Sequence, residues 1–139
     1  MKFNTSCNCI SLRKASNNLT KIYDKALAKV GIKITQFSTL RNIQKLSKTN
    51  TSDLSYVLEL DRTTVLRSIE KLIKMNLVSY KYEQDNKNKK IQLTTVGKNK
   101  LRKAIIIWEE TEEKYIKALG IKNYKEIDAL ITKISKIHI

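Results

Sequence analysis

The segment from Leu60 to Gly97, LDRTTVLRSIEKLIKMNLVSYKYEQDNKNKKIQLTTVG, changes its hydrophobic period halfway along. Apolar residues first recur every three or four positions, which predicts an amphipathic helix. From Val78 they alternate singly with polar residues, stop at a run of Asn and Lys, and then alternate again. This second pattern predicts two antiparallel strands joined by a turn. A helix followed at once by a hairpin therefore constrains the fold more than any other feature of the chain.

Helical periodicity covers most of the remaining sequence. We expect three helices before the one that opens at Asp61, and two more after the hairpin. The expected helices cover, in chain order, residues 9–31, 35–46, 51–60, 61–76, 95–120 and 123–137. The expected N-caps are Thr35, Thr51 or Ser52, Asp61, and Asn123 with Glu126 as its capping-box partner. The chain has no proline and three glycines, so one domain over residues 1–139, mainly α with a small β-hairpin, is the expected fold class.

Two of these helices carry explicit predictions about burial. In the third helix, Leu54, Val57 and Leu58 are expected to face the core. In the fourth helix, the predicted inward stripe is Val65, Ile69, Leu72 and Ile73.

The charge of the chain favours a polyanionic partner. Lys and Arg number 28 against 13 acidic residues, and the net charge is +15. A basic surface also serves solubility, so charge alone does not separate nucleic acid from the alternatives. No apolar run is long enough to cross a bilayer, and the first residues lack the features of a signal peptide, so we expect a cytoplasmic protein that does not bind membranes.

The sequence offers little for catalysis or metal binding. Cys7 and Cys9 are the only cysteines and His138 is the only histidine, which is too few ligands for a typical zinc site. No phosphate-binding glycine loop, Ser/His/Asp set or paired carboxylates stand out. We therefore expect neither a metal, a cofactor nor an enzymatic activity.

The helix after Asp61 carries the residue types that read DNA. Two helices joined by a tight turn, the second with polar and basic residues near its start, form the unit that enters the major groove. Arg67 suits a guanine edge, and hydroxyl groups suit phosphate or the methyl group of thymine. In isolation, such a face is also typical of an ordinary solvated helix. The predicted DNA-contacting residues on this helix are Arg62, Thr63, Thr64 and Arg67.

The hairpin strengthens the DNA-binding interpretation. A hairpin directly after such a helix is the wing of a winged helix-turn-helix, and its tip is rich in lysine. We expect Lys87, Lys89 and Lys90 to contact the DNA backbone or the adjacent minor groove. The helix would then supply sequence preference while the wing supplies affinity.

Three segments resemble the MarR family of winged-helix repressors: LRKASNNLTKIYDKALAKVGIKITQFSTLRNI, DRTTVLRSIEKLIKMNLV and DNKNKKIQLTTVGK. The resemblance implies an obligate homodimer on a pseudo-palindromic operator in double-stranded DNA. It also implies a division of the chain, with residues 1–34 and 95–139 forming a helical dimerisation region around a DNA-binding region at 35–94.

The sequence departs from the family pattern at two positions. The wing of the family usually has an arginine two positions after an aspartate, and here Asp85 is followed by Lys87. Lysine keeps the charge but lacks the planar fork of arginine, so minor-groove recognition should be weaker. Leu66 stands where Thr or Ser is common, and either a contact with thymine or packing against its neighbours accounts for it.

The cysteines suggest a sensor. Cys9 and Tyr23 have a spacing similar to that in the organic-hydroperoxide regulators of the family, in which oxidation of a cysteine relieves repression. The second tyrosine of that site falls on Ile34, so it is missing here. The resemblance implies that Cys9 is oxidised and that Tyr23 bonds the sulfur. If Cys9 becomes a sulfenic acid, Cys7 of either subunit is placed to resolve it to a disulfide. The alternative is that Cys9 is simply a small apolar residue at the dimer seam.

Three other interpretations remain open at this stage. The effector of such a repressor is either the oxidant or a small aromatic ligand in a cleft walled by Trp108 and Tyr23. A nucleoid or RNA-associated protein without sequence preference is an alternative to the regulator. A peroxidase-like enzyme using Cys9 is disfavoured, because no base accompanies the thiol.

Overall fold

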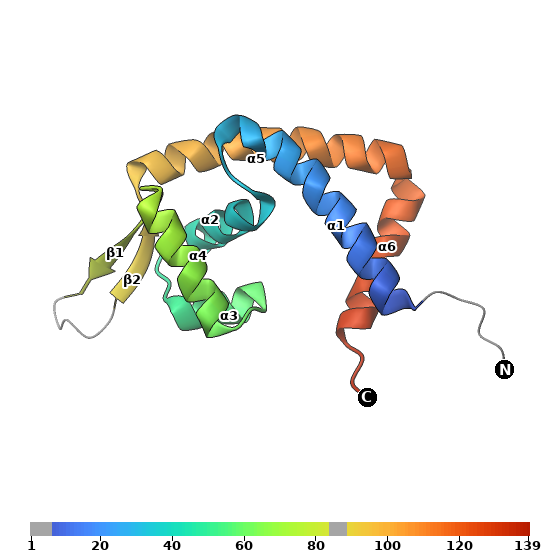
Figure 1. Cartoon of the computed structure of the whole chain (residues 1–139), viewed down its shortest axis with the longest axis horizontal. Helices are drawn as coiled ribbons and strands as arrows, with labels where there is room; N and C mark the ends of the chain where they lie inside the picture. The colour runs from blue at the N-terminus through green and yellow to red at the C-terminus, as the bar shows by residue number, and fades with distance from the viewer. Residues whose placement is uncertain (1–6, 84–88) are drawn as a thin grey trace.

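The computed structural model describes residues 7–83 and 89–139. Six α-helices and one hairpin follow each other in the expected order (Figure 1), so the predicted mainly α winged-helix class is confirmed. The elements are α1 (Asn8–Leu27), the 3-10 turn η1 (Ala28–Val30), α2 (Ile34–Leu46), α3 (Thr51–Leu58), α4 (Arg62–Lys74), β1 (Val78–Tyr82), β2 (Lys89–Leu93), α5 (Thr95–Leu119) and α6 (Ile121–Ser135).

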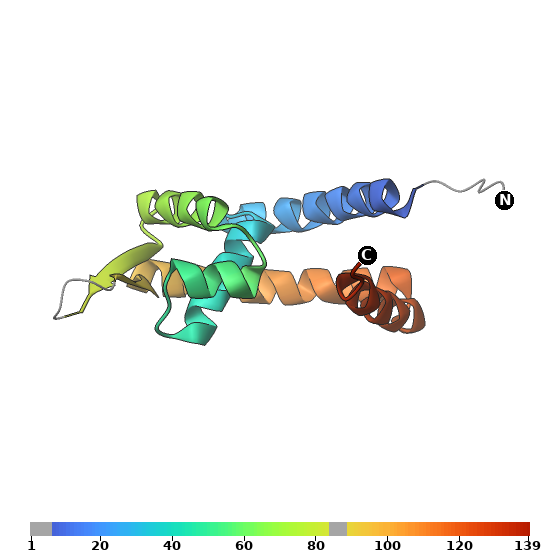
Figure 2. The ribbon, with the colours of Figure 1, turned by 90° about the horizontal axis from the view of Figure 1, so that it is seen from below.

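The long helix α5 spans the molecule and carries two separate groups of elements (Figure 1). At its N-terminal end lie α2, α3, α4 and the hairpin, which together form a compact winged lobe. Towards its other end, α1 crosses α5 and α6 folds back from the end of α5, so both chain ends lie far from the wing (Figure 2). Within the described residues, no helix is both long and apolar enough to cross a membrane.

The hydrophobic core lies inside the winged lobe and beneath the first half of α5. The inward stripe of α4 is as predicted, since Val65, Ile69 and Leu72 are buried while Ile73 is partly buried and packs against the core. In α3, Leu54 is buried and Leu58 partly so, but the prediction for Val57 is wrong, because its side chain is 42% exposed. Among the described residues, the other fully buried large apolar side chains are Leu27, Leu40, Ile43, Leu77, Val78, Ile91 and Leu101.

The hairpin is an antiparallel pair with Val78 opposite Leu93 and Tyr82 opposite Lys89. The linker between α2 and α3 adds to its edge, because the backbone N–H of Ile91 donates to the carbonyl of Thr49 at 2.8 Å. This bond fixes the root of the wing against the helical part of the lobe.

The N-cap residues predicted from the local sequence are partly confirmed and partly wrong. Asp61 caps α4 as predicted, accepting from the Thr64 N–H at 2.7 Å. For α2, the Thr35 prediction is wrong, because the helix starts at Ile34 and the Gln36 side chain accepts from the Lys33 N–H instead.

Two further cap predictions are also wrong. Helix α3 is capped by Asn50, which accepts from the Asp53 N–H at 2.8 Å, rather than by Thr51 or Ser52. Helix α6 begins at Ile121 directly after Gly120, so Asn123 lies inside the helix and its amide donates to the Leu119 carbonyl. Gly120 has φ 88° and ψ 141°, a backbone conformation that glycine adopts easily, and this permits the early start.

The start of α5 is anchored to the turn that precedes β1. Thr94 caps α5 by accepting from the Gly97 N–H at 2.9 Å, and its hydroxyl donates to the Asn76 carbonyl at 2.7 Å. Gly97 lies so close to Leu77 that an added Cβ would be 2.0 Å from the Leu77 carbonyl oxygen. A glycine is therefore required here, because any side chain would push the first turn of α5 away from the lobe.

Candidate nucleic-acid interface

The turn between α3 and α4 sets the direction in which α4 is presented. Helix α3 ends at Leu58, and the next residue, Glu59, has a left-handed backbone conformation with φ 53°. Two residues later Asp61 caps α4. The bond from the Thr64 N–H lowers the pKa of Asp61, and the positive charge of Arg67 lowers it further. A charged carboxylate at the helix N-terminus is favoured by the free amides there. The turn and the cap together hold the first turn of α4 at the surface.

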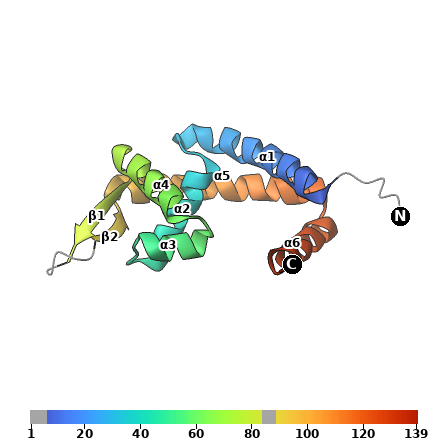
Figure 3. The same cartoon turned by 60° about the horizontal axis from the view of Figure 1, so that its bottom comes forward.

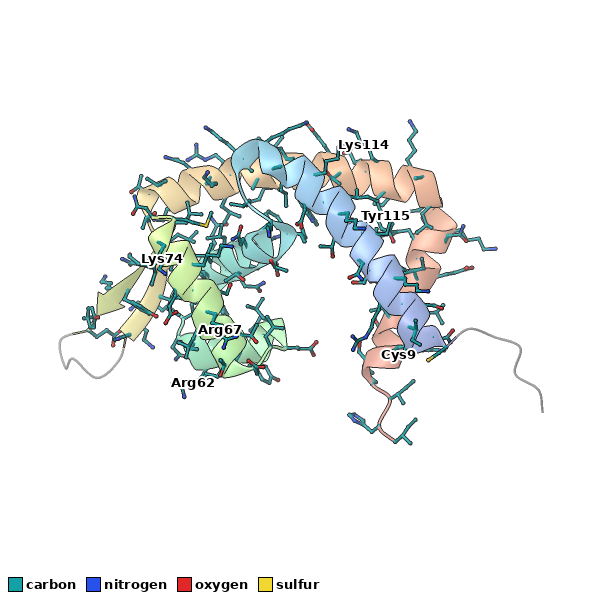
Figure 4. The ribbon with its side chains drawn as sticks, viewed as in Figure 1. Cys9, Arg62, Arg67, Lys74, Lys114 and Tyr115 are labelled. Carbon is teal, nitrogen blue, oxygen red and sulfur yellow. The ribbon has the colours of Figure 1, made fainter. Side chains whose placement is uncertain are left out.

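The outer face of α4 collects the predicted reading residues. Arg62, Thr63, Thr64 and Arg67 are all exposed, while Val65 and Ile69 on the opposite face are fully buried. Figure 4 shows Arg62, Arg67 and Lys74 along α4, from its N-terminal to its C-terminal end. Leu66 is partly buried, which favours packing against its neighbours. The structure therefore brings the four residues together on one accessible surface, and their contact with DNA stays a prediction.

Two of the three predicted wing lysines, Lys89 and Lys90, are described, and they differ in their surroundings. Lys89 is opposite Tyr82, and its ammonium lies 5.2 Å from the centre of the Tyr80 ring and 5.9 Å from that of Tyr82. These cation–π distances hold the Lys89 side chain over the tyrosines. Lys90 is the next residue along the strand, so its side chain points to the other face of the hairpin. Lys87 and Asp85 lie outside the described residues.

Sequence reasoning missed two basic residues beside Lys90. Lys81 is its cross-strand partner, and both line a surface hollow together with Lys48 from the α2–α3 linker. Residues opposite each other in an antiparallel pair share a face, so the pairing of the strands brings Lys81 and Lys90 together. The alternating pattern in the sequence placed both lysines on strands. That they lie opposite each other follows only from the register of the hairpin, which the sequence alone does not specify.

Within one chain, Tyr23 lies far from the two predicted redox cysteines. Cys7 and Cys9 are free and exposed. Figure 4 shows Cys9 at the start of α1. Tyr23 lies on the same helix 14 positions after Cys9, and at a rise of about 1.5 Å per residue this corresponds to roughly 21 Å. The Tyr23 hydroxyl instead donates to the Glu112 carboxylate of α5. Burial, followed by this hydrogen bond, raises the pKa of Tyr23.

Glu112 is the centre of a small polar cluster where three helices meet. Besides accepting from Tyr23 of α1, its negative charge raises the pKa of Tyr124 in α6. The Tyr124 ring in turn packs edge-on against Tyr115 of α5, with ring centres 5.9 Å apart. The cluster ties α1 to α5 and lies at the root of α6.

The proposed aromatic wall residues are both occupied within the chain. Trp108 stacks on Phe37 of α2 with ring centres 5.7 Å apart, and the Arg41 guanidinium lies 4.7 Å from the centre of the Trp108 ring. Tyr23 is 7% exposed. These contacts join α5 to the winged lobe, and a ligand between Trp108 and Tyr23 stays a prediction.

Comparisons with known proteins agree with this geometry. The family model of a winged helix DNA-binding domain matches residues 34–97. A comparison with curated protein sequences finds no match. Among solved structures, the M. tuberculosis transcriptional regulator MosR in complex with DNA is 30% identical, with a TM-score of 0.77 over 95% of this chain and 100% of that chain.

Two more distant structures share the fold. The S. aureus MepR–DNA complex is 20% identical with a TM-score of 0.82, covering 94% of this chain and 97% of that chain. A mutant E. coli MarR with operator DNA is 18% identical with a TM-score of 0.80, covering 88% and 89%. The 30% identity to MosR over 95% of this chain, together with the winged helix domain, shows that this protein belongs to the MarR family of winged-helix transcriptional regulators.

Proposed function

We propose that this chain binds a pseudo-palindromic operator in double-stranded DNA as a homodimer and represses transcription until an oxidant or a small ligand releases it. The observation that carries the proposal is the outer face of α4, where Thr63, Thr64 and Arg67 are exposed above a fully buried inner stripe. MosR was crystallised with DNA, which supports the same partner for this chain.

Each part of the surface has its own role in the proposal. Arg67 and the two threonines read base edges in the major groove, where bidentate contacts discriminate bases. Lys90, with Lys81 and Lys48 beside it, binds phosphates and supplies affinity without sequence preference.

The homodimer is supported by apolar surface that one chain leaves uncovered. Ile127, Leu130, Ile131 and Ile134 form one face of α6, and each is at least 36% exposed. Ile10 and Leu12 near the start of α1 are also exposed. Contiguous apolar surface of this kind marks an interface, and a second copy is the partner that the family resemblance implies.

The sensor is less constrained than the DNA-binding surface. Cys9 is accessible to an oxidant, and Cys7 lies two residues away to resolve a sulfenic acid as a disulfide. Because Tyr23 is bonded to Glu112, it is not available to a sulfur atom in the described arrangement. We therefore assign the redox role to the two cysteines and leave Tyr23 a structural role.

The first test is binding of the reduced protein to DNA from its own upstream region, titrated against random duplex at fixed salt. We expect clear preference for the upstream DNA. Arg67→Ala should reduce that preference about tenfold, while Lys90→Ala should weaken both duplexes alike and lower the salt dependence. Arg13→Ala, at the far end of α1, is the matched control. Equal affinity for both duplexes would instead support the nucleic-acid-binding protein without sequence preference.

The same assay after mild hydroperoxide treatment tests the sensor. Loss of binding that is absent in Cys9→Ser supports oxidation at Cys9. Operator binding that ignores the oxidant contradicts the redox role and favours a ligand.

A further inference from the structure

A groove lies where α1 crosses α5, away from α4 and the wing. It has a volume of about 420 Å³ and is lined by residues between Ile22 and Lys29 of α1 and between Thr111 and Ala118 of α5. On each helix the lining residues recur at intervals of three and four, so each helix contributes one continuous face. Seven residues of helix give the groove a length of about 10 Å.

The rim of the groove is positively charged. Lys25 and Lys29 lie on the α1 side and Lys114 on the α5 side, and no carboxylate is among the lining residues. Within the described parts of the chain, the one ion pair with a nitrogen–oxygen distance of 4.0 Å or less joins Lys122 and Glu126. None of the three lysines is therefore neutralised by an ion pair. Figure 4 shows Lys114 and Tyr115 on α5 beside the crossing, well separated from Arg62 and Arg67.

The floor of the groove is mainly aliphatic. Ile22, which is 44% exposed, Ala26 and Ala118 contribute methyl and methylene groups. The one aromatic ring, Tyr115, already packs edge-on against Tyr124. The walls therefore suit an alkyl chain better than a planar ring that needs a stacking partner.

We propose that this groove binds an organic anion with an aliphatic body, such as a medium-chain carboxylate. An apolar pocket with a few convergent charged groups is the usual form of a small-molecule site, and the volume lies in the usual range. The alkyl chain would cover the exposed part of Ile22 and the alanines, and the carboxylate would accept from the lysines at the rim. Charge-assisted hydrogen bonds of this kind give both affinity and selectivity for an anion.

A second copy of the chain fits the groove less well. The surface of a second copy that could pack here is the exposed apolar face of α6, formed by Ile127, Leu130, Ile131 and Ile134. None of these four side chains is a carboxylate, so packing them onto the groove would place its three lysines against apolar groups, which costs free energy that an anionic ligand would not cost.

The position of the groove gives the ligand a route to the winged lobe. Helix α1 holds the start of α2, because the Asp24 carboxylate accepts from the Ile34 N–H at 2.8 Å. Helix α5 holds the same helix through the Trp108–Phe37 stack. A ligand that changes the angle between α1 and α5 would therefore move α2 and the lobe. This regulatory step rests on the proposed function, whereas binding to the groove does not.

The experiment is isothermal titration of the full-length protein with decanoate, decanol and decyltrimethylammonium. We expect saturable binding of one decanoate per chain and much weaker binding of the uncharged and cationic probes. Lys114→Gln should weaken decanoate binding about fivefold without changing decanol, while Lys117→Gln on the same helix should leave both unchanged. Lys25→Gln repeats the test from α1, should the Lys114 variant fold poorly.

Four outcomes would overturn the proposal. The first three are an absence of saturable decanoate binding, equal binding of decanoate and decanol, and equal effects of Lys114→Gln and Lys117→Gln. Binding that occurs only in a monomeric variant such as Ile131→Glu would also overturn it, since the groove would then be covered by the second copy.

A parallel DNA titration separates this proposal from the proposed function. Preference for the upstream DNA without any decanoate binding means that only the groove assignment has failed. Decanoate binding without DNA preference means that only the regulator has failed, because the titration does not depend on DNA.

Discussion

In the winged lobe, Leu40, Ile43, Leu54, Ile69 and Leu72 are each at most 1% exposed, whereas α6 contains no buried residue at all. The two regions have similar kinds of side chains, and α6 is also rich in isoleucine. They differ in what surrounds those side chains. In the lobe three helices and a hairpin enclose one core, while α6 extends from the end of α5, apart from the lobe (Figure 3). The apolar side chains of α6 are exposed.

This difference indicates that the two regions obtain their stability from different sources. Burial of apolar surface contributes about 25 cal/mol per Å², and the lobe gains this within one chain. Helix α6 gains little of it within one chain, and short isolated helices are only marginally stable in water. Folding of the terminal helices should therefore depend on protein concentration, whereas folding of the lobe should not.

The largest expected effect is from Ile131→Glu, which tests this dependence directly. The change places a carboxylate in the centre of the proposed dimer interface, and an unpaired buried charge should weaken the dimer at least a hundredfold. Sedimentation velocity should show a monomer, and circular dichroism should show partial loss of helix. Amide signals of the lobe should remain dispersed in NMR spectra.

Ala129→Glu is the matched control, because Ala129 lies on the opposite face of α6 and is also exposed. It should remain dimeric. Equal dissociation in both variants would mean that added charge, rather than the apolar face, is responsible. An Ile131→Glu protein that stays dimeric would contradict the assignment of α6 to the interface.

The next effect concerns the junction between the two regions. Gly97→Ala places a Cβ against the Leu77 carbonyl oxygen, where the backbone leaves no space. Overpacking of this kind should lower the free energy of unfolding by about 3 kcal/mol. Urea denaturation followed by the Trp108 fluorescence measures it. Lys98→Ala, at the next and exposed position, should change the midpoint little, and a similar loss in both variants would contradict the close-approach argument.

The spacing of the apolar residues predicted the helices and strands of the lobe better than it predicted the helix caps. The change from helical to alternating spacing identified α4 and the hairpin correctly, because each has one buried and one exposed face. The cap of α3 was missed because residues 47–53 contain several side chains that can cap a helix, and only the path of the chain selects Asn50.

Contacts between distant residues were not predictable from local pattern. The grouping of Lys81 with Lys90 depends on hairpin register, and the need for Gly97 depends on the approach of α5 to Leu77. The Tyr23–Glu112 bond joins residues 89 positions apart, so nothing in the neighbourhood of Tyr23 indicated it. In α6, the apolar periodicity placed Ile127, Leu130, Ile131 and Ile134 on one face, and the fold of one chain leaves that face exposed.

A smaller effect is expected from Tyr23→Phe, which removes the main polar contact between α1 and α5. The Glu112 carboxylate would lose one charge-assisted hydrogen bond, and the free energy of unfolding should fall by about 1.5 kcal/mol. Tyr56→Phe is the control, because Tyr56 is 86% exposed. If the two regions are as separate as their burial suggests, Tyr23→Phe should increase amide exchange in α1 and leave α4 unchanged. Faster exchange in both would show that the lobe depends on the terminal helices.

The smallest effect should come from Asp61→Ala, which changes the lobe at a single cap. The hydrogen bond from the Thr64 N–H lowers the pKa of Asp61 below its ordinary value of 3.8. Because the folded-state pKa is the lower one, the charged cap stabilises the folded protein above pH 3.8, and this contribution is lost as the pH falls through the folded pKa. The difference in unfolding midpoint between Asp61→Ala and the unaltered protein should thus be constant near neutral pH and narrow in acid. Since the lobe has its own core, loss of this cap should fray only the first turn of α4, where Arg62 and Thr63 are presented, and operator binding should weaken before global stability does.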